Sequence, residues 1–157
     1  MVDAANRFKV NKIFLGMAHR GRLNTLACVL DKPYEQIFGE FKEKKGVNFH
    51  EDEYGFSGDV KYHLGHNTDR YYPDGSNINI QILPNPSHLE TVNTVVMGKA
   101  RSDMDNHGDL TGDKVLTCLV HGDAAFAGQG VCYEGLQMEK LKGYTCIYLD
   151  FSDSILI

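Results

Sequence analysis

The feature that most constrains the fold of this chain is a buried strand followed at once by a turn of small residues, at residues 115–130. Residues 115–120 (VLTCLV) are apolar apart from Thr117, a pattern typical of a strand covered on both faces of a parallel sheet. The next ten residues, HGDAAFAGQG, carry little side-chain bulk, and a helical pattern follows from near Gln129. Such a turn lets backbone approach a phosphate closely, and Asp123 at the strand end offers an oxygen ligand for Mg²⁺.

The same residues also fit an ordinary strand–helix turn in which Asp123 caps a helix. The turn is not a dinucleotide-binding fingerprint, because Gly128-Gln129-Gly130 lacks a third glycine at the required spacing. It is not a Walker loop either, because no Gly-Lys-Ser/Thr follows. The residues alone therefore leave the phosphate-binding and the purely structural interpretation open.

The composition limits the kinds of binding partner that the chain is expected to have. The 157 residues include 16 basic and 21 acidic side chains, and the net charge of −5 argues against a nucleic-acid surface. The run Arg20-Gly21-Arg22 therefore suits one small anion better than a polymer. No run approaches the roughly twenty apolar residues that cross a bilayer. The four cysteines lack C-x-x-C spacing, which predicts reduced thiols in an intracellular protein.

The periodicity predicts an α/β fold with a mainly parallel sheet flanked by helices. Strands are expected at residues 13–15, 77–83, 115–120 and 144–151, and helices at 2–8, 21–31, from Pro33, 87–104 and 129–143. Ser87 and Glu90 fit a capping box at the start of the fourth helix, whose inward residues would be Leu89, Val92, Val95 and Val96. Polar, aperiodic residues 42–58 and 66–76 are expected to be mobile loops.

Polar groups follow several of these strands. They are His19, Arg20 and Arg22 after the first strand, His63 and His66 before the second, and His121 and Asp123 after the third. Loops at the carboxyl ends of parallel strands converge, so a shared site is expected. Either arginine would hold a phosphate or carboxylate, and His19 and His63 would serve as acid–base groups or donors. A zinc site from His63, His66 and an aspartate is a weaker possibility. Asn85, Ser87 and Glu90 can be explained as purely architectural.

Five ungapped blocks resemble one family in order and spacing. They are GMAHRGRLN (16–24), GDVKYHLG (58–65), NPSHLE (85–90), VVMGKAR (95–101) and HGDAAFAGQG (121–130). The family is the thiamine-diphosphate-dependent E1 component of the 2-oxoglutarate dehydrogenase complex. The resemblance covers roughly residues 10–144, and it implies part of a thiamine-diphosphate-binding fold.

The resemblance implies a role for each matched residue. Asp123 corresponds to the family's Mg²⁺ ligand, Gly122 and Ala124 pack on the diphosphate, and Arg20 binds a cofactor phosphate. His19 and His63 correspond to the catalytic histidines that face the 2-oxo acid. The implied activity is that of succinyl-transferring oxoglutarate dehydrogenase: decarboxylation of 2-oxoglutarate, then transfer of the succinyl group to lipoyl-bearing E2. The implied partners are E2, E3 and a second E1 subunit, and the implied location is the mitochondrial matrix, otherwise the cytoplasm.

The sequence also departs from the family. The family's Mg²⁺ motif closes with an asparagine about thirty residues after the aspartate, as Mg²⁺ needs further oxygen ligands, and no asparagine follows Asn106 here. Residues 145–157 no longer resemble the family. We therefore expect residues 1–157 to form an incomplete diphosphate-binding domain with a divergent tail, inactive alone. The alternatives are a non-catalytic anion-binding or partner-dependent module and a metal-dependent hydrolase using His63, His66 and Asp123.

Overall fold

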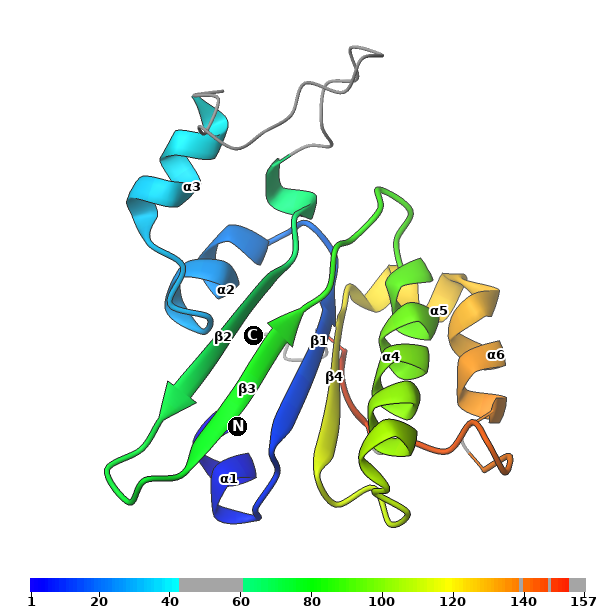
Figure 1. Ribbon diagram of the computed structural model, residues 1–157. Helices are drawn as coiled ribbons and strands as arrows, with labels where there is room; N and C mark the ends of the chain where they lie inside the picture. Colours follow the sequence, from blue (N-terminus) through cyan, green and yellow to red (C-terminus); the bar gives the residue numbers. More distant parts are fainter. Residues whose placement is uncertain (43–60, 139, 147, 153–157) are drawn as a thin grey trace, which may run out of the picture.

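The computed structural model describes residues 1–42, 61–138, 140–146 and 148–152, which fold around one five-stranded sheet (Figure 1). Across the sheet the strands are β2 (His66–Tyr71), β3 (Asn77–Ile82), β1 (Lys12–Met17), β4 (Val115–His121) and β5 (Tyr148–Ser152). The helices are α1 (Val2–Arg7), α2 (Arg22–Cys28), α3 (Tyr34–Phe41), α4 (Thr91–His107), α5 (Asp123–Gly128) and α6 (Gly130–Met138), with a short 3₁₀ helix, η1 (Lys61–His63).

Strand β1 lies at the centre and runs parallel to β3 and β4, while β5 is parallel to β4. Only β2 is antiparallel, through its pairing with β3. The predicted α/β fold with a mainly parallel sheet is therefore confirmed. The apolar runs of β1 and β4 are buried nearly throughout because helices cover both faces of the sheet.

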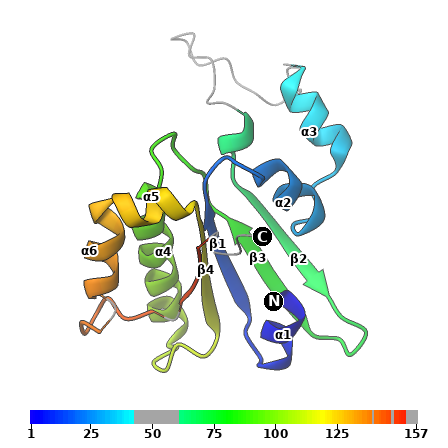
Figure 2. The same ribbon diagram turned by 180° about the vertical axis from the view of Figure 1, so that it is seen from behind.

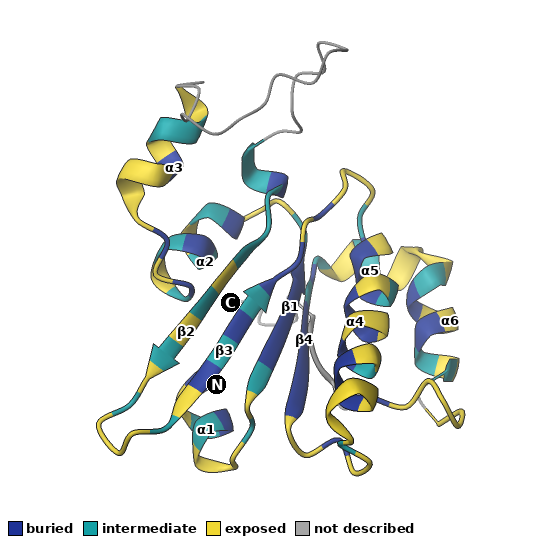
Figure 3. Ribbon diagram, in the orientation of Figure 1, coloured by how far each residue is buried: buried dark blue, intermediate teal, exposed yellow. Residues whose placement is uncertain are grey.

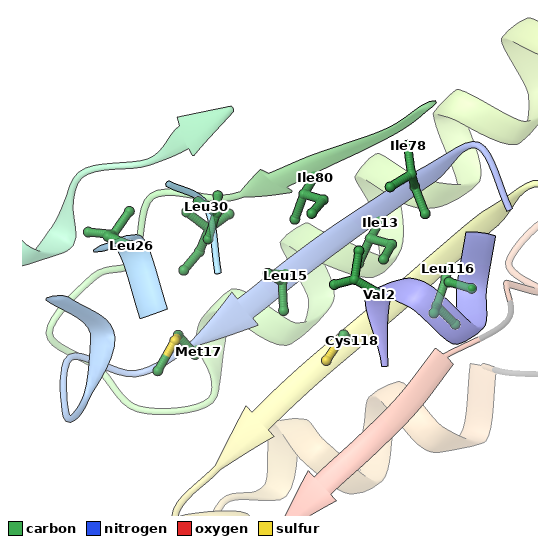
Figure 4. Packing of buried hydrophobic residues seen from close by; sticks show 12 residues of the cluster. Val2, Ile13, Leu15, Met17, Leu26, Leu30, Ile78, Ile80, Leu116 and Cys118 are labelled. Atoms are coloured by element: carbon green, nitrogen blue, oxygen red, sulfur yellow. The ribbon is translucent and has the colours of Figure 1, made fainter. Parts of the chain in front are cut away.

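Alternate residues of the strands supply two separate cores. On one face, α1 and α2 cover the strands (Figures 2 and 4). This first core contains Ile13 and Leu15 of β1, Ile80 of β3, Cys118 of β4 and Leu26 of α2, among others. On the other face, α4 packs on β1 and β4, with α6 beside α4. The second core is formed by Phe14, Leu83, Val92, Val96, Met97, Ala100, Met104, Val115, Leu119 and Cys146.

Strand β2 is a correction to the sequence prediction. Residues 66–71 form this strand where a mobile loop was expected, and only residues 72–76 make the turn into β3. Its sequence, HNTDRY, has low intrinsic strand propensity, but pairing with β3 overrides that propensity. Exposed and half-buried residues alternate along it, as on an edge strand (Figure 3). The other expected loop, 42–58, lies outside the described residues apart from Lys42.

The predicted capping box at α4 is wrong. The helix begins at Thr91, its N-cap is Glu90 in the left-handed conformation (φ 73°), and no side chain caps it. Ser87 is exposed, and the Glu90 carboxylate is turned into the protein rather than towards the helix backbone. The inward stripe was also partly wrong: Val92 and Val96 are buried, Leu89 is half-buried and Val95 is 59% exposed.

The elements that follow β4 differ from the prediction in their bounds. Helix begins directly at Asp123 instead of near Gln129, because α5 and α6 divide the stretch between them. The expected final strand forms as β5 and pairs in parallel with β4. Of the four cysteines, Cys28 is exposed and Cys118, Cys132 and Cys146 are buried. Among the described residues, no helix is both long and apolar enough to cross a membrane.

Candidate functional site

The carboxyl ends of β1, β3 and β4 share one rim of the sheet, at the upper edge in Figure 1. Met17 of β1 is paired with Val120 of β4, and Leu15 with Ile82 of β3. The segments that follow these strands therefore start side by side, since neighbouring strands lie about 4.8 Å apart. They carry most of the polar residues that the sequence singled out.

His19 and His63 are brought together although 44 positions separate them. His19 lies exposed in the bend after β1, and His63 is buried (3% exposed) at the end of η1. Their ring centroids are 6.3 Å apart, and the Tyr62 ring lies 6.1 Å from His19 and 5.0 Å from His63. The expected convergence of these two segments is thus observed. One accessible and one buried imidazole at a common edge can donate protons or hydrogen bonds to a small polar ligand.

The two arginines of the first loop have different environments. Arg20 is exposed after β1, whereas Arg22 is the first residue of α2 and is fully buried. The Arg22 guanidinium donates to the carbonyl oxygens of Met17 (3.1 Å), Leu64 (2.9 Å) and Leu83 (2.5 Å). Burial lowers the pKa of Arg22 to about 10. The suggestion that Arg22 holds an anionic ligand is therefore wrong, and Arg20 remains the candidate.

Asp123 and its neighbours directly follow the end of β4, where the chain leaves the sheet. Gly122 is extended (φ −85°, ψ 138°), and Asp123 and Ala124 are exposed in the first turn of α5. A side chain added at Gly122 would meet only the Cβ of Ala125, at 4.0 Å, so the backbone here is open to close approach. An exposed carboxylate beside small residues fits a metal-bound diphosphate. Asp123 could supply one oxygen ligand of such an ion, whose octahedral set needs further ligands.

The chain leaves β1 and β4 towards opposite faces of the sheet. Helix α2, which follows β1, packs into the first core through Leu26. Phe126 of α5, which follows β4, instead packs against His121, with ring centroids 4.7 Å apart, near α4 and α6. A position where successive connections diverge in this way is where α/β sheets bind ligands. Arg20 and Asp123 thus stand at the starts of two connections that lead to opposite faces of the sheet.

A buried polar network around Glu90 and His121 is not predicted by the sequence pattern. His121 Nδ1 donates a short hydrogen bond to the Glu90 carboxylate, and both side chains are almost fully buried. Asn93 Nδ2 donates to the same Glu90 oxygen (2.9 Å), and Cys132 Sγ lies 3.6 Å from it. The network connects β4, α4 and α6. The sequence signal was present but was assigned to a capping box, because Glu90 stands three positions after Ser87.

Asn85 is a second residue whose environment the sequence pattern does not predict. It is 3% exposed, and its backbone N–H donates to the His63 carbonyl (3.0 Å). Within the described chain, neither polar atom of its side-chain amide has a hydrogen-bond partner. An unsatisfied buried polar group costs about 1–3 kcal/mol, so this amide beside His63 is an available donor and acceptor at the rim.

The zinc hypothesis does not fit the structure. His66 begins β2, and its pKa is lowered by burial and by the nearby charge of Lys32, an effect that Glu40 partly offsets. Histidine, cysteine and acidic side chains of the described segments form no group of three able to hold a metal. His63, His66 and Asp123 therefore do not make a hydrolytic metal centre in the part of the chain described.

Comparison with known proteins adds an independent finding. The sequence matches the dehydrogenase E1 component family over residues 4–149. It is 51% identical to the 2-oxoglutarate dehydrogenase E1 component of Brucella anthropi and 48% identical to those of Brucella ovis and Brucella canis, each over 153 residues. Each alignment covers 92% of this chain but 15% of the relative. The chain thus corresponds to a small segment of these proteins.

Proposed function

The chain belongs to the dehydrogenase E1 component family, and from this premise we propose that it is the diphosphate-binding segment of a 2-oxoglutarate dehydrogenase E1. The proposed cofactors are thiamine diphosphate and Mg²⁺, and the proposed substrate is 2-oxoglutarate. The observation that carries the proposal is the shared rim, where the His19 and His63 rings meet (6.3 Å) next to the strand exit that bears Asp123. Cationic, anionic and proton-donor groups at one edge of the sheet support the proposal.

In this proposal each residue has a task that its environment supports. The exposed Arg20 guanidinium binds phosphate oxygens through its fork of N–H donors. The Asp123 carboxylate gives one oxygen to Mg²⁺, and Gly122 and Ala124 leave room for the phosphates.

The two histidines act on the substrate. Thiamine diphosphate, when bound, supplies the electron sink for decarboxylation of a 2-oxo acid. His63, held in place by burial against Tyr62, donates a hydrogen bond to the substrate oxygen on which negative charge develops. The more accessible His19 binds the substrate carboxylate and exchanges protons with solvent.

Other parts of the proposal concern the assembly. The succinyl group would pass to lipoyl-bearing E2, with E3 completing the complex, and a second E1 subunit would complete the active site. The mitochondrial matrix is the proposed location in a eukaryote, and the cytoplasm in a bacterium. The proposed partners and the proposed location rest on family membership alone, and no residue of this segment bears on them.

Calorimetric titration of the 157-residue chain tests cofactor binding. Thiamine diphosphate should bind only with Mg²⁺ present. Asp123→Asn should weaken that binding at least tenfold, because the metal loses a charged ligand, while the matched control Asp113→Asn, in an exposed loop, should not change it. Saturable Zn²⁺ binding without any thiamine diphosphate response would favour the hydrolase instead. No response to either would favour a non-catalytic module.

Activity needs the remainder of the enzyme, so it is tested in a chimera. Residues 4–149 of this chain replace the matched segment of the Brucella anthropi E1 component. The chimera should decarboxylate 2-oxoglutarate with an artificial electron acceptor. His63→Gln should lower kcat about 10²–10⁴-fold through loss of proton transfer or charge stabilisation. A chimera that binds thiamine diphosphate but decarboxylates no 2-oxo acid would contradict the proposed activity.

A further inference from the structure

Arg22 is an unusual buried cation. Its side chain is fully buried, and its hydrogen-bond acceptors are three backbone carbonyl oxygens rather than a carboxylate. Among the described residues, its Nε has no hydrogen-bond partner. Burying a charge without an ion-pair partner costs several kcal/mol, and a well-packed apolar residue is often the more stabilising choice. Stability alone therefore does not account for an arginine at this position.

The three carbonyls belong to three segments at the rim, those that carry His19, His63 and Asn85. Met17 is the last residue of β1, two positions before His19. Leu64 directly follows His63, and Leu83 directly follows β3, two positions before Asn85. One planar guanidinium with fixed N–H directions thus joins the backbone of the three segments that carry His19, His63 and Asn85.

The packing around these contacts leaves the segments little freedom. A Cβ added at Gly65 would lie 2.9 Å from the Ile82 carbonyl oxygen and 2.9 Å from Pro84 Cδ, so the chain after η1 lies directly on the end of β3. The Asn85 N–H bond to the His63 carbonyl closes the same junction. By contrast, the contact between the histidines is one of rings at 6.3 Å, which does not fix their separation by itself.

We infer that Arg22 is a positioning residue that sets the separation of His19 and His63 by binding the backbone of all three rim segments, without touching substrate or cofactor. For the activity, this inference rests on the proposed function, but the geometric part does not. A lysine at position 22 would keep the charge and could reach one or two carbonyls. It could not hold three in a fixed plane, because the ammonium lacks the guanidinium fork.

The geometric test uses NMR of the 157-residue chain. The wild-type chain should give NOEs between the ring protons of Tyr62 and those of His19. Arg22→Lys should lose them while retaining the dispersed methyl signals of the core. The matched control is Arg70→Lys, because Arg70 also donates to a backbone carbonyl, that of Val29 (2.9 Å), outside the rim. NOEs unchanged in Arg22→Lys would overturn the inference.

The kinetic test uses the chimera described above. Arg22→Lys should lower kcat for 2-oxoglutarate about 100-fold, since a displacement near 1 Å in an active site can cost that much. The dissociation constant of thiamine diphosphate should change less than threefold, and Arg70→Lys should match the unmodified chimera. A loss in cofactor affinity as large as the loss in kcat would indicate a general structural role and contradict the inference.

A variant that does not fold and a chimera that is inactive also have defined meanings for the inference. If Arg22→Lys does not fold, Arg22→Met, which keeps the volume and removes the buried charge, takes its place. Failure of both to fold would make Arg22 a folding residue and overturn the inference. If the unmodified chimera is inactive, the proposed function fails, and the NOE comparison still decides the role of Arg22.

Discussion

At the scale of single residues, buried polar groups organise the rim. Arg22, His63, Asn85, Glu90 and His121 are each at most 4% exposed, yet all lie at or just beyond the carboxyl ends of the strands. Most buried polar groups are hydrogen-bonded: Arg22 holds three backbone carbonyls, and Glu90 holds the side chains of His121 and Asn93. The exposed residues Arg20 and Asp123 are left free to meet a ligand.

Glu90 illustrates this dependence and gives a prediction. Glu90→Ala should lower the free energy of unfolding by about 3–5 kcal/mol, because His121 and Asn93 would lose their shared buried acceptor. Glu90→Gly should be less damaging than Glu90→Ala by about 1 kcal/mol, since residue 90 has φ 73°. Urea unfolding measures both, with exposed Glu35→Ala as the control. Equal losses in Glu90→Ala and Glu35→Ala would refute this account of the network.

Residue types and spacing could predict which residues reach the rim, but not which of them are buried. His19, His63 and Asp123 stand next to strand ends in the sequence, and parallel strands bring such positions together. Arginine is rarely fully buried, so nothing in HRGR separates Arg22 from Arg20. Glu90 matched a local capping pattern, whereas its real partner is His121, 31 positions away. Local patterns do not reveal such long-range pairs.

At the scale of elements, α4 packs directly on β1. A Cβ at Gly16 would lie 2.7 Å from Val96 Cγ2 and 3.1 Å from Leu119 Cδ2, so α4 can lie this near the sheet only over a glycine. Val96 is β-branched and fully buried, which leaves it few alternative rotamers. The approach of α4 also brings Glu90, at its N-terminus, to His121.

This packing gives a prediction with an internal control. Gly16→Ala should destabilise the chain by about 1–3 kcal/mol through overpacking. Gly98→Ala, on the exposed side of α4, meets nothing within 4 Å and should stabilise it by up to about 1 kcal/mol through helix propensity. Thermal unfolding followed by circular dichroism measures both. A melting temperature unchanged by Gly16→Ala would mean that α4 lies farther from β1 than described.

Element prediction succeeded where the hydrophobic pattern was strong. The runs of β1 and β4 and the alternation of β3 identify buried and half-buried strands directly. It failed for β2, whose polar sequence becomes a strand only through pairing with β3. It also failed at α5, where glycines and alanines suggest a turn but the backbone is already helical.

At the scale of the whole molecule, α3 presents an apolar surface to solvent. Tyr34, Phe38 and Phe41 are 58%, 61% and 47% exposed, while Ile37 of the same helix is buried. The Tyr34 and Phe38 rings stack with centroids 6.5 Å apart. Exposed aromatic side chains grouped on one helix favour association.

We therefore expect the isolated chain to self-associate. Light scattering after size exclusion should show mass increasing with concentration. Phe38→Lys with Phe41→Lys should reduce that increase, because charge replaces exposed apolar surface. Tyr71→Lys, at the 75% exposed end of β2, is the matched control for loss of one exposed aromatic elsewhere. A monodisperse monomer at all concentrations would rule out this expectation.

The central place of β1 in the sheet has a consequence for synthesis on the ribosome. β1 is complete at Met17, but its neighbours are residues 79–82 and 115–120, made about sixty to a hundred residues later. At roughly 5–20 residues per second, the segment KIFLGM waits on the order of 5–20 seconds for its second neighbour. Factors that shield apolar nascent segments would therefore encounter this strand before any sheet exists to receive it.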